Sequence, residues 1–163
     1  MTTTQKARHT LTIISDTEIE IQRTFNAPAR LVFEAWTKPE YMARWYGCAA
    51  MTMVACEIDA RTGGSYRWTL RMPDGSEHNF KGVYRELVPP SKMVCTEAYL
   101  LGDTWTNDLV NNVSMVEADE KTTVTNRVVY ASQADRDGHL GSGMENGMAE
   151  TFDRLDEFLQ TLK

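Results

Sequence analysis

Four polar residues stand in stretches of alternating apolar residues, the pattern that turns every second side chain of a strand toward the protein interior. They are His78, Glu97, Asn112 and Asn126. A carboxyl group in apolar surroundings has a raised pKa and can exchange protons near neutral pH, and a histidine beside it would be a suitable partner. A catalytic site would also need a nucleophile or a third orienting group, which the pattern does not supply. We therefore expect His78 and Glu97 to orient a bound ligand. Acid–base chemistry, or a position at the rim of the sheet in solvent, are the alternatives.

Sequence motifs of the common enzyme and metal classes are absent. The chain has no HExxH, GxSxG, P-loop or GxGxxG pattern. Its cysteines, Cys48, Cys56 and Cys95, form no CxxC pair and have no zinc-ligand spacing with histidine. We expect free thiols in a reducing compartment, no bound metal and no cofactor.

The charge balance argues against nucleic acid and membrane surfaces as partners. The 163 residues include 17 basic and 23 acidic side chains, a net charge of −6, with no basic run. Phosphate-rich surfaces need clustered Lys and Arg. No apolar stretch approaches the roughly 20 residues of a spanning helix, and the polar first residues lack the apolar block of a signal peptide. The expected location is the cytoplasm.

The pattern of apolar residues predicts an α+β domain. Seven strands are predicted, near residues 18–25, 54–59, 65–72, 77–88, 93–101, 105–117 and 122–130. Helical spacing predicts two short helices after the first strand, between Pro28 and Gly47, and further helices near 133–140 and 142–161. Residues 1–17 have little apolar pattern, so we expect a flexible lead-in followed by a single domain at 18–163.

Capping-box spacing predicts where three of the helices begin. A Ser or Thr followed three residues later by an acidic residue can satisfy the free N–H groups of a first turn. The pairs are Thr37 with Glu40, Ser132 with Asp135, and Ser142 with Glu145.

The long C-terminal helix decides the predicted architecture. Its apolar residues form a single stripe, so the helix must lie on one face of a curved antiparallel sheet, which leaves space between sheet and helix. Gly82, which has no side chain, would add room there. We predict that this space binds a ligand, although a filled core is the common outcome. The predicted lining is Tyr66, Trp68, Leu70, His78, Phe80, Tyr84, Cys95 and Glu97 from the strands and Met144, Met148 and Phe152 from the helix.

An ordered set of short segments resembles a known superfamily. Residues 23–28, 32–40 and 43–47 resemble the opening of the START-like (SRPBCC, helix-grip) superfamily, and residues 56–59, 63–64, 73–75, 82–84, 89–90 and 143–155 agree in order. The most similar branch resembles the C-terminal domain of the activator of heat-shock protein 90 ATPase. The resemblance implies the helix-grip fold, and members of the superfamily bind lipids, sterols or other apolar ligands between sheet and helix.

The expected function is therefore the binding of a small apolar or amphipathic molecule by a domain without catalysis of its own, acting as a monomer or homodimer. Two alternatives stay open. The branch name implies a stress-response module that interacts with a chaperone, and some superfamily members are cyclases, so a cyclase- or hydrolase-like enzyme would use the same pocket.

Overall fold

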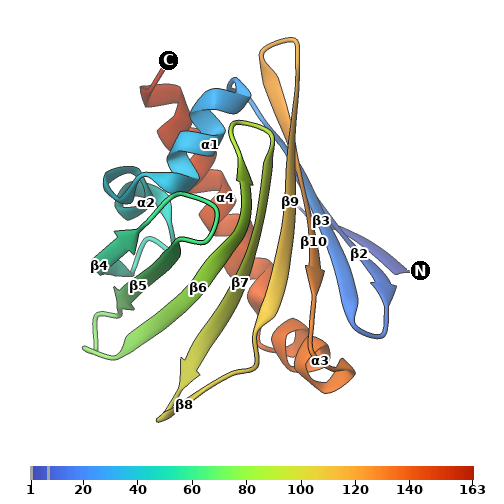
Figure 1. The fold of residues 1–163 in the computed structure, drawn as a ribbon, viewed down its shortest axis with the longest axis vertical. Coiled ribbons are helices and arrows are strands. Elements are labelled where there is room, and N and C mark those ends of the chain that lie inside the picture. The colour runs from blue at the N-terminus through green and yellow to red at the C-terminus, as the bar shows by residue number, and fades with distance from the viewer. Residues whose placement is uncertain (1, 7) are drawn as a thin grey trace.

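An antiparallel sheet of ten strands forms most of the protein, as Figure 1 shows for the computed structural model, which describes residues 2–6 and 8–163. The strands follow one another in the order β1-β2-β3-β10-β9-β7-β6-β5-β4, and β8 pairs with β7 beside this path. Their bounds are Thr2–Lys6 (β1), His9–Ser15 (β2), Glu18–Phe25 (β3), Thr52–Ile58 (β4), Ser65–Arg71 (β5), Glu77–Val88 (β6), Lys92–Leu101 (β7), Thr104–Trp105 (β8), Leu109–Ala118 (β9) and Lys121–Val129 (β10). Because β3 pairs with β10, an early strand and a late strand meet in the middle of the sheet.

Alternation in the sequence explains why the sheet has one apolar face. In β5, Tyr66, Trp68 and Leu70 are buried, while Ser65 and Arg67 between and beside them are exposed. Successive side chains of a strand point to opposite faces, so one face of an antiparallel sheet can pack on a core while the other meets water.

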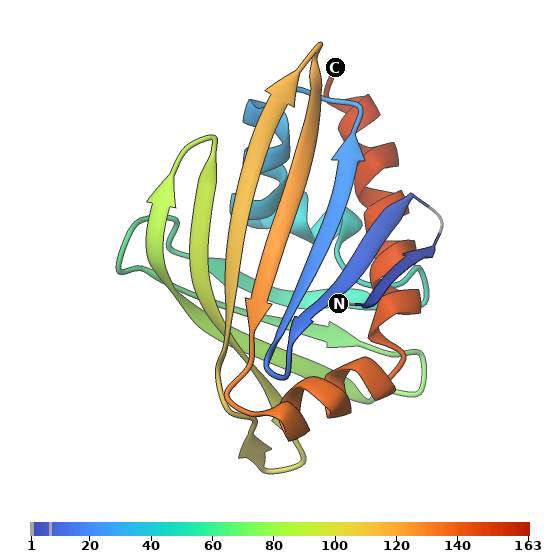
Figure 2. The same ribbon diagram turned by 90° about the vertical axis from the view of Figure 1, so that its right-hand side faces the viewer.

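Three of the four helices of the described residues lie over the concave face, and the other lies at one end of the sheet (Figures 1 and 2). The helices α1 (Ala29–Thr37) and α2 (Pro39–Trp45) follow β3, and α3 (Gln133–Gly141) and α4 (Met144–Thr161) follow β10. Figures 1 and 2 show α1, α2 and α4 on the same side of the sheet, which curves around them, and α3 at one end of it. The predicted α+β helix-grip fold is therefore confirmed. None of the helices formed by the described residues is long and apolar enough to cross a membrane.

One predicted capping box is confirmed. At the start of α3, the backbone N–H of Asp135 donates to the hydroxyl oxygen of Ser132 (3.1 Å). The other two predictions were wrong, because α2 begins after Lys38 and α4 begins after Gly143, and neither residue caps its helix with a side chain. Gly143 has φ +82°, a backbone conformation that glycine adopts without strain.

The residues predicted to begin these two helices instead serve the helices before them. Thr37 is the last residue of α1, and its hydroxyl donates to the carbonyl of Phe33 (2.9 Å). Ser142 follows α3, and its hydroxyl donates to the carbonyl of His139 (2.7 Å). Ser and Thr can satisfy either helix end, so the spacing alone did not choose between them.

The N-terminal segment differs from the lead-in expected over residues 1–17. It contains β1 and β2, and β2 pairs with β3. His9 and Leu11 of β2 are buried. The first helix therefore follows the third strand, and the sheet is larger than predicted. Met1 and Ala7 lie outside the described residues.

The long helix α4 has two different halves. Its buried residues all lie in the C-terminal half, where they join the larger core cluster with α1 and α2: Leu155, Phe158 and Leu159. Three apolar residues of the N-terminal half pack against a smaller cluster over β2, β3 and β10 but stay partly exposed: Met144, Met148 and Phe152. The first half of α4 is therefore the part that does not seal the concave face.

Candidate functional site

Three polar side chains run diagonally across the concave face on neighbouring strands: Glu97 on β7, Asn111 on β9 and Asn126 on β10, here called the inner polar row. Their cross-strand partners include Leu109, Val128 and Ile21, which belong to the cluster against which the first half of α4 packs. Since directly opposite residues share a face, the row lies under this half of α4. All three row residues are half-buried.

Hydrogen bonds hold the two amides of the row in place. The side-chain N–H of Asn126 donates to Oδ1 of Asn111 (2.9 Å), and Nδ2 of Asn111 lies 4.0 Å from Sγ of Cys95. Oδ1 of Asn126 is buried and has no hydrogen-bond partner among the described residues. A buried acceptor without a donor costs free energy, so this end of the row is incomplete without a further group.

Glu97 is the ionisable residue of the row. Burial raises its pKa from 4.5 to about 7, and the side chain of Asn111, which stabilises the charged form, opposes the shift. None of the ion pairs among the described residues involves Glu97. Near neutral pH the carboxyl group is therefore poised between its neutral and charged forms.

Aromatic side chains form the wall beside Glu97. The ring of Trp68 is flanked by Tyr66 (centroids 4.5 Å apart) and by Tyr46 (5.1 Å). Nε1 of Trp68 is buried and has no hydrogen-bond partner among the described residues. Burial raises the pKa of Tyr46 and of Tyr66 above the ordinary tyrosine value, and the negative charge of Glu97 adds to both shifts. Both phenols therefore stay neutral at physiological pH and lie within electrostatic reach of Glu97.

Tyr130 is a further aromatic residue within electrostatic reach of Glu97. Burial, and then the charge of Glu97, raise the pKa of Tyr130, whose hydroxyl pairs with Nδ1 of His139 on α3 (2.6 Å). Burial lowers the pKa of His139. Burial also raises the pKa of the Cys95 thiol to about 12, with Glu97 as the second cause. Glu97 thus lies among neutral neighbours drawn from several elements.

The helix side of the site is apolar and partly exposed. Met148 and Phe152 are partly exposed, and the ring of Phe152 meets that of Phe25 edge-on (centroids 5.5 Å apart). A Cβ atom built at Gly147 would have no neighbour within 4 Å. Methionine side chains re-pack easily around apolar shapes, which suits a surface that accommodates a ligand.

The predicted pairing of His78 with Glu97 was wrong. Nδ1 of His78 lies 2.7 Å from the hydroxyl of Tyr99, and the two rings stack with centroids 5.9 Å apart. Phe80 packs on the same Tyr99 ring (5.1 Å). His78 and Phe80 therefore form a partly buried aromatic group with Tyr99 on the same face of the sheet, and the ring of Phe80 meets that of Tyr46 edge-on (centroids 6.3 Å apart).

The other strand residues of the predicted lining belong to the core. Tyr66, Trp68, Tyr84 and Cys95 are buried members of the larger cluster, and Leu70 is buried beside Gly47. The structure thus divides the predicted ligand-binding residues into buried core residues and partly exposed residues. The partly exposed ones are Glu97, His78, Phe80, Met144, Met148 and Phe152.

Asn112, one of the polar residues expected on the inner face of the sheet, faces the convex side, and its neighbour Asn111 lies on the inner face. Asn112 points to the convex face, where its side chain donates to the carbonyl of Arg127 (3.1 Å). Asn111 points inward instead, because it lies opposite the buried Val128 of β10, while Asn112 lies opposite the exposed Arg127. Asn126 faces inward as expected.

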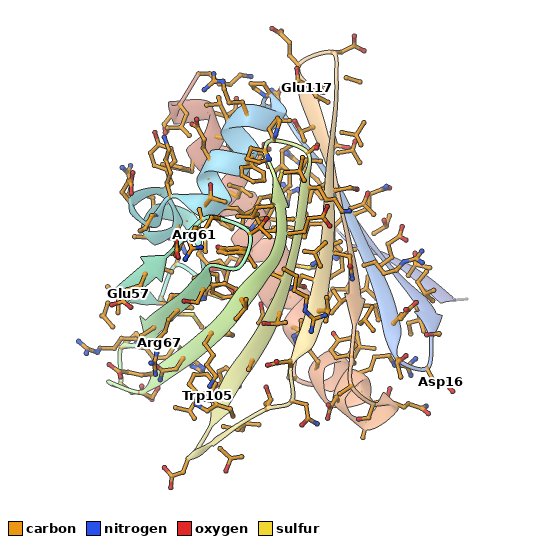
Figure 3. All side chains as sticks on the ribbon, in the orientation of Figure 1. Asp16, Glu57, Arg61, Arg67, Trp105 and Glu117 are labelled. Carbon is orange, nitrogen blue, oxygen red and sulfur yellow. The ribbon has the colours of Figure 1, made fainter. Side chains whose placement is uncertain are left out.

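Two surface hollows lie away from the inner polar row. One, of about 260 Å³, is lined by residues of β4, β5 and the turn between them, and the other, of about 470 Å³, lies between Arg8, Arg23 and the acidic residues of α4. The convex face carries a separate cluster in which Lys81 Nζ lies 4.2 Å and Arg67 Cζ 5.8 Å from the ring centroid of Trp105 (Figure 3).

The fold and the row together define a helix-grip domain with an ionisable, aromatic-lined inner face. Residues 26–160 match the family described as Activator of Hsp90 ATPase homolog 1-like protein, and the chain belongs to this family. No curated protein matches the chain in sequence.

Solved structures show the same fold. A protein from Rhodobacter sphaeroides is 24% identical, with a TM-score of 0.87 over 94% of this chain and 99% of that one. A protein from Nitrosomonas europaea is 20% identical, with a TM-score of 0.80 over 91% and 97% of the two chains. An AHSA1-like protein from Aeromonas hydrophila is 16% identical, with a TM-score of 0.69 over 89% and 93%. At these identities the likeness concerns the fold alone.

Proposed function

We propose that this domain binds a small amphipathic molecule between the first half of α4 and the inner polar row. The observation that carries the proposal is the partial exposure of apolar residues on α4 directly opposite partly exposed polar residues on the sheet. Covering the apolar surface of Met148 and Phe152 would contribute roughly 25 cal/mol for each Å² removed from water, before the cost of ordering the ligand. The row would fix the orientation of the polar end.

Binding can be measured with a neutral fluorescent probe, N-phenyl-1-naphthylamine, and by native mass spectrometry of the purified protein. A Met148→Trp variant would fill the space beside Gly147, so we expect probe affinity to fall by about tenfold or more while the fold is kept. Val116→Trp is the matched control, because Val116 is 63% exposed on the convex side of β9. Unchanged probe binding in Met148→Trp, or no binding by the wild type, would refute the proposal.

Acid–base catalysis in the same place is a second candidate, and the pKa of about 7 for Glu97 favours it. A general base works best when its pKa lies near the working pH. The experiment is an NMR titration of the Glu97 carboxyl carbon. An ordinary carboxyl pKa would remove this candidate, because Glu97 would then be a weak base.

Interaction with a chaperone is the candidate that the family description supports. It predicts that the protein stimulates the ATPase activity of a bacterial Hsp90. No stimulation at saturating protein would remove it.

A further inference from the structure

We propose that the ligand of this site carries a protonated amine, which the carboxylate of Glu97 binds from within the aromatic wall. The inference rests on the proposed function and specifies the chemical class of the ligand. Three features of the site carry it: the lack of a cation beside Glu97, the surplus of acceptors along the row, and the aromatic rings around it.

The first feature is the missing counter-charge. None of the ion pairs among the described residues includes Glu97, and no basic side chain contributes to the shift of its pKa. The side chain of Asn111 acts on the pKa of Glu97. The charge of Glu97 in turn acts on the pKa values of the neighbouring phenols and thiol, those of Tyr46, Tyr66, Tyr130 and Cys95. A buried carboxylate is stable when a cation accompanies it. A ligand ammonium group would supply that cation.

The second feature is the balance of donors and acceptors. Asn126 gives its side-chain N–H to Asn111 and keeps a buried Oδ1 without a partner among the described residues. Asn111 turns its own Nδ2 toward Cys95. The Asn111 side chain also hydrogen-bonds Glu97, so it is a donor to this carboxylate. Oδ1 of Asn126 and the other lone pairs of the carboxylate exceed that supply, so the row has more acceptor positions than donors. An ammonium group has three N–H donors and no acceptor, so it fits this deficit.

Aromatic rings are the third feature. Trp68 contacts both Tyr46 and Tyr66, and these two phenols and that of Tyr130 lie within electrostatic reach of Glu97. Ring faces attract cations, which favours an amine over a carboxylic acid of the same shape. The net charge of −6 also favours the approach of a cation over that of an anion.

The titratable groups around Glu97 allow a sharp test of pH dependence. Tyr46, Tyr66, Tyr130 and Cys95 have raised pKa values and stay neutral near pH 7. Burial lowers the pKa of His139, which pairs with the Tyr130 hydroxyl, so its imidazole is neutral near pH 7. His78 and Tyr99 share the face of Glu97 and pair with each other (2.7 Å). The apolar residues of the first half of α4, Met144, Met148 and Phe152, do not titrate. Ionisation of Glu97 should therefore increase the affinity for an amine about tenfold between about pH 6 and about pH 8.

Calorimetric titration with octylammonium, 1-octanol and octanoate tests the inference, because the probes share one alkyl chain and differ only in the head group. We expect octylammonium to bind about tenfold more tightly than 1-octanol at about pH 8, and octanoate to bind most weakly. In Glu97→Gln the preference for octylammonium over 1-octanol and its pH dependence should disappear. Glu97→Asp keeps the charge and should retain the preference. Glu57→Gln, which neutralises an exposed carboxylate on the edge strand β4 (Figure 3), is the matched control and should behave as the wild type.

Equal affinities for the three probes, or an amine preference that survives in Glu97→Gln, would overturn the inference and leave the proposed function standing. Failure of octylammonium to bind would also overturn it. The proposed function fails as well only if N-phenyl-1-naphthylamine does not bind, or if it binds Met148→Trp as tightly as the wild type.

Discussion

The ring of Tyr66 lies across the backbone of Gly82, so close that a Cβ atom at Gly82 would stand 2.5 Å from two ring carbons. The Tyr66 hydroxyl donates to the backbone carbonyl of Thr96 on β7 (2.6 Å). The space that the missing side chain of Gly82 would open is thus occupied by an aromatic ring. Gly82 acts by letting Tyr66 lie flat beside the strand that carries Glu97.

A Gly82→Ala substitution should therefore destabilise the protein. The new Cβ would stand 2.0 Å from the carbonyl oxygen of Thr96, which belongs to the backbone and cannot move away cheaply. We expect a loss on the order of 3 kcal/mol in the free energy of unfolding, measured by urea denaturation. Tyr66→Phe is a useful comparison, since it removes only the hydrogen bond and should cost about 1 kcal/mol. A Gly82→Ala protein as stable as the wild type would show that the ring does not need this glycine.

The opposite outcome is expected for Gly147→Ala in α4. A Cβ there meets nothing within 4 Å, and alanine is favoured over glycine inside a helix. The variant should gain about 0.5–1 kcal/mol in urea denaturation, with unchanged affinity for a small neutral probe. A loss of stability would mean that the space beside Gly147 is filled in solution.

Much of the fold was predictable because it depends on periodicities that extend over many residues. The alternation in β5 and the apolar stripe of α4 each set which face of an element is buried. The hairpin of β1 and β2 was missed because Leu11 and Ile13 make too short an alternation in an otherwise polar segment. Its burial depends on pairing with β3, which is a tertiary effect.

The site was harder to predict, because a shift of one residue turns a side chain to the other face of a sheet. The segment around Asn111 and Asn112 has valines at Val110 and Val113, which differ in parity, so no clean alternation chose between the two asparagines. Tyr46 was missed for a different reason. It stands in the loop after α2 and reaches Trp68 only through the packing of α2 on the sheet.

The pH dependence of stability should reveal the buried carboxyl group. The pKa of Glu97 is raised from 4.5 to about 7 in the folded protein, so its contribution to stability is fully present below about pH 4.5 and is lost as the pH rises through 7. Glu97→Gln removes this loss. The variant should match the wild type near pH 5 and exceed it near pH 8 by an amount on the order of 2 kcal/mol. Urea denaturation of both proteins across this range measures the difference.

Other groups also titrate in that range, so the informative quantity is the difference between the two proteins. Glu57→Gln provides the baseline, because Glu57 is exposed. A difference between wild type and Glu97→Gln that is constant with pH would mean that Glu97 ionises normally, and the amine inference would lose one of its supports.

A buried cation ties the sheet to the exposed side of α4. Arg23 of β3 has a side chain that is 1% exposed, and its Nη1 donates to Oδ1 of Asp153 (2.9 Å), whose side chain is 53% exposed. Nε and Nη2 of Arg23 have no partner among the described residues, and its guanidinium carbon lies 5.1 Å from the ring centroid of Phe25. The positive charge of Arg23 is therefore compensated mainly by the carboxylate of Asp153.

Removing Asp153 should cost more than removing the arginine itself. Asp153→Ala leaves the buried guanidinium without its carboxylate, for which we expect a loss on the order of 2 kcal/mol. Arg23→Met keeps most of the side-chain volume and removes the unpaired N–H groups, so it should cost less than about 1 kcal/mol. In the Arg23→Met background, Asp153→Ala should then have almost no effect. Urea denaturation of the four proteins gives this coupling directly, and independent, additive losses would show that the pair does not stabilise the docking of α4 on β3.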